Sequence, residues 1–86
     1  MPEICRFYGI VIFMYQNDHE PGHFHARYAG RTAVFSVGPV EMIRGSIAAR
    51  AERLVIEWAT THERDLQINW RLARDLKELN KIAPLE

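Results

Sequence analysis

The first half of the chain divides into apolar segments with the two-residue period of β-strands. Residues 9–15 (GIVIFMY) are apolar throughout and rich in β-branched and aromatic side chains, which predicts a central strand buried on both faces. Residues 23–28 (HFHARY) and 31–37 alternate between apolar and polar positions, which predicts strands with one face in the core. A short fourth strand is predicted over residues 40–44. The connections are too short for crossovers, so the strands should form an antiparallel meander.

Turn residues separate these segments. Residues 29–30 (Ala-Gly) predict a hairpin turn, and residues 21–22 (Pro-Gly) predict a turn with positive φ at Gly22. Residues 1–7 are expected to be an entry segment outside the sheet, because Pro2 discourages early strand pairing.

From Ser46 onward, the period of the apolar positions changes from two to about 3.6, which predicts helices. Ser46 is the expected N-cap. Residues 60–63 (TTHE) match a capping box, so a break with a restart is expected there, and one continuous helix is the alternative. Residues 81–85 are expected to be extended and docked. The two helical stripes consist of Ala51, Leu54, Val55, Trp58 and Ala59, and of Leu66, Trp70, Ala73 and Leu76.

Strands followed by helices predict an α+β fold, with a small antiparallel meander of three to four strands and two helices, or one broken helix, packed on one face. We expect a single domain over residues 1–86, with the meander and its His-rich loop and strand in 1–45 and the helical part in 46–80. The predicted core comprises Ile10, Ile12, Phe24, Tyr28, Phe35, Leu54, Val55, Trp58, Leu66 and Trp70.

Composition narrows the classes of function. Eleven basic and eleven acidic residues give a net charge of zero, which argues against non-specific binding to nucleic acid or a membrane surface. The longest apolar run, residues 10–15, is far shorter than the roughly 20 residues of a membrane-spanning helix. A single cysteine, Cys5, and the lack of a charged-then-apolar leader predict a cytoplasmic protein.

Chemically useful side chains concentrate around residues 18–27. His19, His23 and His25, three of the four histidines, fall within seven residues. In an extended strand, His23, His25 and Arg27 share the face opposite the core, and Asp18 lies in the loop before them.

Several segments of the chain match one known family: RFYGI (6–10), NDH (17–19), HFHARY (23–28), LVIEWA (54–59), His62, Leu66, Asn69-Trp70 and Ala73. On these segments the chain resembles the bacterial domain-of-unknown-function 4160 family. The resemblance implies a small bacterial protein that is often encoded beside a domain-of-unknown-function 2442 protein, as one component of a toxin–antitoxin-type pair. It implies no catalytic residue.

Three functions remain open. On the interpretation that we favour, the protein binds a small partner protein encoded nearby, through Asp18, His19 and Arg27; a homodimer is an alternative, and no membrane partner is expected. A second hypothesis is metal-independent cleavage of RNA, with His23 and His25 as acid and base and Arg27 stabilising the phosphorane.

The third hypothesis is a divalent-metal site formed by His19, His23 and His25, with Asp18 as an additional carboxylate. The primary expectation is that the protein has no cofactor, and a bound divalent ion is the alternative. The spacing His19-x3-His23-x-His25 matches no standard metal-binding motif, so the residue types alone support this site.

Overall fold

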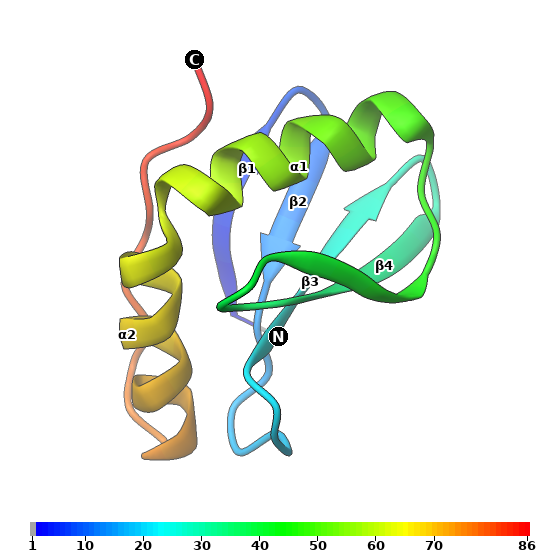
Figure 1. Cartoon of the computed structure of the whole chain (residues 1–86). Coiled ribbons are helices and arrows are strands. Elements are labelled where there is room, and N and C mark those ends of the chain that lie inside the picture. Colours follow the sequence, from blue (N-terminus) through cyan, green and yellow to red (C-terminus); the bar gives the residue numbers. More distant parts are fainter. Residues whose placement is uncertain (1) are drawn as a thin grey trace.

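The structure is a computed structural model that describes residues 2–86 (Figure 1). Five strands form one antiparallel sheet in the order β1-β2-β3-β4-β5, and two helices follow. The predicted α+β class and meander are confirmed, with one strand more than expected. The elements are β1 (Glu3–Phe7), β2 (Ile10–Phe13), β3 (His23–Tyr28), β4 (Arg31–Ser36), β5 (Glu41–Gly45), α1 (Ala49–Thr61) and α2 (Glu63–Arg74).

The additional strand is β1, which the sequence predicted to be an entry segment. It pairs with β2 through a tight turn in which Tyr8 and Gly9 both have positive φ, 49° and 81°. This backbone pattern matches a two-residue hairpin turn, but Tyr rarely adopts it, so the residue types at this position do not predict a turn. Pro2 also joins the pairing, because its carbonyl oxygen accepts a hydrogen bond from the Met14 amide at 3.1 Å. Met1 lies outside the described residues.

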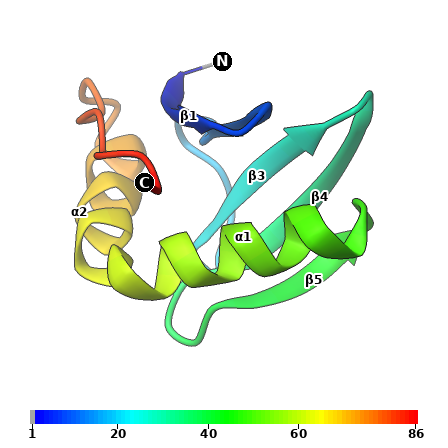
Figure 2. The same ribbon diagram turned by 90° about the horizontal axis from the view of Figure 1, so that it is seen from above.

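Helix α1 crosses one face of the sheet, and α2 stands beside the sheet (Figures 1 and 2). The core lies beneath α1, where the indole of Trp58 packs near the rings of Phe7 and Phe24. Tyr28, Leu54 and Trp70 are only partly buried, so the prediction that they are core residues was too strong. The predicted core residues that are fully enclosed are Ile10, Ile12, Phe24, Phe35, Val55, Trp58 and Leu66.

The predicted helix break is confirmed, but its cap differs from the prediction. His62 ends α1 and precedes α2, and its backbone amide donates to the Trp58 carbonyl at 3.1 Å, with no side-chain cap. The capping-box prediction was therefore wrong. Helix α1 starts at Ala49 after Ala48 rather than Ser46, because β5 extends to Gly45 and buried Ile47 anchors the connection.

The C-terminal segment docks in extended form, as expected. The Ile82 amide donates to the Ile4 carbonyl at 2.9 Å, and the Trp58 indole donates to the Ala83 carbonyl at 2.8 Å. This segment therefore ties β1 to α1. Neither α1 nor α2 has the length and apolar character needed to cross a membrane.

Candidate metal centre

The loop between β2 and β3 is held against α2, although the two are about fifty residues apart in the sequence. The Asn17 amide donates to the Ala73 carbonyl at 2.9 Å, and the Glu20 carboxylate pairs with the Arg74 guanidinium. These contacts fix the position of the loop residues that face the start of β3.

Gly22 allows the loop to approach α2 closely. A Cβ atom at this position would lie 3.3 Å from the Trp70 ring, tighter than most such contacts. The prediction of a positive φ at Gly22 was wrong, because positive φ among the described glycines occurs at other positions. The Trp70 ring also packs 5.0 Å, centroid to centroid, from the His23 ring. Helix α2 therefore covers a histidine that the strand pattern assigned to an open face.

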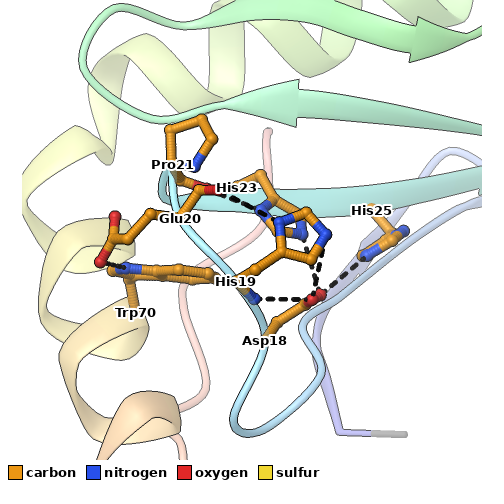
Figure 3. A network of polar contacts seen from close by, with 7 residues as sticks. All are labelled: Asp18, His19, Glu20, Pro21, His23, His25 and Trp70. Atoms are coloured by element: carbon orange, nitrogen blue, oxygen red, sulfur yellow. Dashed lines mark hydrogen bonds and ion pairs between the residues drawn. The ribbon is translucent and has the colours of Figure 1, made fainter.

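Asp18 is the acceptor on which the loop converges (Figure 3). Its Oδ1 accepts the His19 amide at 2.9 Å, and its Oδ2 lies 2.9 Å from His23 Nε2 and 3.9 Å from His25 Nε2. Burial opposes ionisation, but the His19 amide and the His23 ring outweigh it and hold the pKa of Asp18 below its usual value. Asp18 is therefore an anion at neutral pH.

His23 is 2% exposed, and each of its ring nitrogens faces an oxygen acceptor. Nδ1 lies 2.8 Å from the Pro21 carbonyl, which can only accept, so Nδ1 carries a hydrogen. Nε2 donates to Asp18 Oδ2 at 2.9 Å, because an ionised carboxylate can only accept, and a bound ion would have to take the place of that hydrogen. A backbone carbonyl that fixes one imidazole nitrogen and directs the other is the arrangement seen around metal-bound histidines.

His25 has a different environment on the same strand face. Its ring stacks on Phe13 at 5.0 Å and meets Tyr15 edge-on at 4.9 Å. Its Nε2 is buried and has no hydrogen-bond partner among the described residues. Burial first, and then His23, lowers the pKa of His25, so the imidazole is neutral near pH 7 and its nitrogen is able to act as a ligand.

The structure thus brings together three ligand atoms from Asp18, His23 and His25, all within 4.8 Å of one another. In a tetrahedral zinc site with bonds of about 2.0–2.1 Å, ligand atoms are about 3.3 Å apart. The Asp18–His23 distance of 2.9 Å is slightly shorter than this value, and the Asp18–His25 distance of 3.9 Å is slightly longer. The 4.8 Å that bounds the whole set exceeds the tetrahedral separation, so an ion would have to draw the side chains closer together.

The remaining predicted site residues lie outside this set of three. The His19 side chain is 71% exposed, with its Nε2 3.7 Å from Asp18 Oδ1. Arg27 is exposed, and its Cζ lies 5.5 Å from the centroid of the Phe13 ring. Trp70, predicted to be a core residue, packs on His23 beside the site. Because the two residues are far apart in the sequence, no local pattern predicts this contact.

The comparisons with known proteins give one match. The model of a protein family described as Domain of unknown function (DUF4160) matches residues 9–71, which include the whole loop and strand β3. Searches of curated proteins and of solved structures found no match.

Proposed function

This chain belongs to the DUF4160 family, a domain of unknown function, and we propose that it binds a divalent transition-metal ion through Asp18, His23 and His25. The observation that carries the proposal is the buried Nε2 of His25, which has no hydrogen-bond partner among the described residues and faces a carboxylate. A buried nitrogen without a partner costs about 1–3 kcal/mol. A bound cation would remove that cost.

The ligand types favour zinc or a similar transition ion. Two imidazoles and one carboxylate suit such ions, whereas Mg²⁺ and Ca²⁺ prefer sites made of oxygen atoms. Three protein ligands leave a fourth tetrahedral position for water or another molecule. Asp18 forms the partly exposed side of the cluster, and the exposed ring of His19 lies beside it. An ion bound here would therefore be open to exchange from that side.

Metal-independent RNA cleavage receives less support from the geometry. A histidine acting as acid or base needs a nitrogen within reach of the substrate. Both nitrogens of His23 face protein acceptors, and Nε2 of His25 is buried. A metal site needs inward-facing nitrogens, which Nε2 of His25 supplies directly and Nε2 of His23 would supply once an ion replaces its hydrogen.

We propose binding of a partner protein as the second candidate function, as expected for one component of a toxin–antitoxin-type pair. An exposed apolar surface on α2 supports it, and the metal proposal does not depend on it.

The test is thermal unfolding of protein that has first been stripped with a chelator. Zn²⁺ or Ni²⁺ at about 100 times its Kd should stabilise the fold by about 2.7 kcal/mol, because the unfolded chain lacks the assembled site. For a domain of this size, that corresponds to an increase in Tm of roughly 10–20 °C. Mg²⁺ should have little effect.

Three single variants assign the ligands. His25→Ala should abolish the increase in Tm, because it removes one of the three ligands. His62→Ala is the matched control, since that histidine pairs with Asp65 away from the site. His19→Ala should retain most of the response if three ligands suffice. A Tm unchanged by Zn²⁺, Ni²⁺ and Mn²⁺ would exclude the proposal.

A further inference from the structure

Helix α2 and the turn that follows it carry a second apolar stripe on the side that faces away from the core. Ile68 is 46% exposed and Leu76 is 66% exposed, and Leu72 lies between them at four-residue spacing. The side chains that α2 buries against the rest of the molecule are Leu66, Asn69 and Ala73. Helices on protein surfaces normally present charged or polar residues outward. The outward stripe of α2 is therefore not explained by packing within this domain.

The end of α2 places Leu76 at a position that normally takes glycine. Its amide donates to the Ala73 carbonyl at 3.1 Å, and the Lys77 amide donates to the Leu72 carbonyl at 2.9 Å. This is a Schellman cap, in which the residue after the helix is left-handed and usually glycine. Leu76 has a φ of 58° here, which costs roughly 1 kcal/mol for a residue with a side chain. An exposed leucine in a strained backbone position is a candidate for contact with a partner.

Basic side chains border this stripe. A groove of about 410 Å³ is lined by Ile68 and Leu72 together with three cations, Arg64, Arg71 and Lys77, and one carboxylate, Asp75. The groove therefore has an excess of positive charge, although the whole chain has a net charge of zero. A complementary ligand would combine apolar side chains with carboxylates.

We infer that Ile68, Leu72, Leu76 and these bordering cations form a docking face for an amphipathic helix of a partner protein whose apolar stripe is flanked by Asp and Glu. Two apolar positions four residues apart, with a shallow groove beside them, fit the binding of a helix through its own i and i+4 anchors. The cations would set the orientation and accelerate association. This inference specifies the surface for the second candidate function.

The docking face is separate from the candidate metal centre. Trp70, which packs on His23, points from α2 toward the loop and the sheet, whereas Ile68 and Leu72 line the groove on another side of the helix. Figure 1 shows α2 at one edge of the molecule. Failure of metal binding would therefore leave this inference intact.

The experiment uses the full chain and two labelled synthetic peptides in fluorescence anisotropy. Both peptides are amphipathic helices with leucine at i, i+4 and i+7; one carries glutamate beside the leucines, and the other carries lysine at the same positions. The glutamate peptide should bind and the lysine peptide should not. Ile68→Ser should weaken binding at least about tenfold, the equivalent of 1.4 kcal/mol. Arg71→Glu should shift the preference toward the lysine peptide.

Ile43→Ser is the matched control, because Ile43 is an isoleucine on β5 with a similar exposure of 49%. It should leave binding unchanged. Absence of binding at about 1 mM, the weak end of specific association, would overturn the inference. Equal binding of both peptides would contradict the inference that the partner helix carries acidic residues beside its apolar stripe. Binding that survives Ile68→Ser would keep a protein-binding role but remove this surface from it. Sedimentation that shows a dimer dissociated by Ile68→Ser would make a second copy the occupant instead.

Discussion

The two faces of strand β3 are buried by different parts of the molecule. On the inner face, Phe24 and Ala26 are 0% exposed beneath α1. On the outer face, His23 is 2% exposed, His25 is partly buried and Arg27 is exposed. On the inner face only Tyr28, at the hairpin end, is partly buried, whereas on the outer face exposure already begins at His25 and is complete at Arg27.

The difference arises because hydrophobic burial lacks direction, whereas polar burial needs specific partners. Phe24 requires only other apolar surface and finds it in Phe35 and Trp58. His23 requires oxygen acceptors at both nitrogens, which the loop supplies through Pro21 and Asp18. Alternation along a strand predicts the first kind of burial but not the second.

The largest expected effect belongs to the inner face. Phe24→Ala should lower the free energy of unfolding by about 3–5 kcal/mol, because it leaves a cavity between two aromatic rings. Urea denaturation followed by circular dichroism measures this loss. A loss below about 1 kcal/mol would show that the inner face is not the main source of stability.

Asp18→Asn should have the next largest effect. In metal-free protein it should cost about 1–3 kcal/mol, because the charge-assisted bond to buried His23 is lost. The same variant should show no increase in Tm with Zn²⁺. Asp65→Asn serves as the control, since Asp65 pairs with His62 at the surface of α2. If the two variants have equal stability, the outer face does not depend on Asp18.

In metal-free protein, acidification should lower the free energy of unfolding through protonation of His25 on the outer face. Burial lowers the pKa of His25 below its ordinary value of about 6.5, so the unfolded chain binds this proton more readily than the folded one. Stability should therefore fall as the pH drops below about 6.5 toward the lower pKa of the folded state. Melting curves of His25→Gln across this interval should show a weaker pH dependence. Parallel curves for wild type and variant would contradict the assignment of this pH dependence to His25.

Arg27→Ala should have the smallest effect. Its guanidinium lies over Phe13 at an exposed position, where such contacts contribute about 0.5–1 kcal/mol. The response of Tm to Zn²⁺ should remain, because Arg27 is not one of the three ligands. If the variant no longer responded to Zn²⁺, metal binding would depend on the hairpin end of β3 as well.

Hydrophobic periodicity alone determined most of the architecture. It predicted the meander, the change to helices after Gly45 and most of the core, because each depends on the regular placement of apolar side chains. The break near His62 was predicted from a capping box, which the structure does not form. It missed β1, whose hairpin turn uses Tyr8 in a conformation that few tyrosines adopt. The same local reasoning placed the helix start at Ser46, although the length of β5 determines where α1 begins.

The sequence by itself also determined which strand carries the chemistry, because three histidines cluster around β3. Only the tertiary structure decided which of them converge. Helix α2 anchors the loop through Ala73 and Arg74, and the loop carries Asp18 to His23 and His25 while leaving His19 exposed. These contacts link residues about fifty positions apart. They depend on where packing places α2, which no local pattern around the histidines encodes.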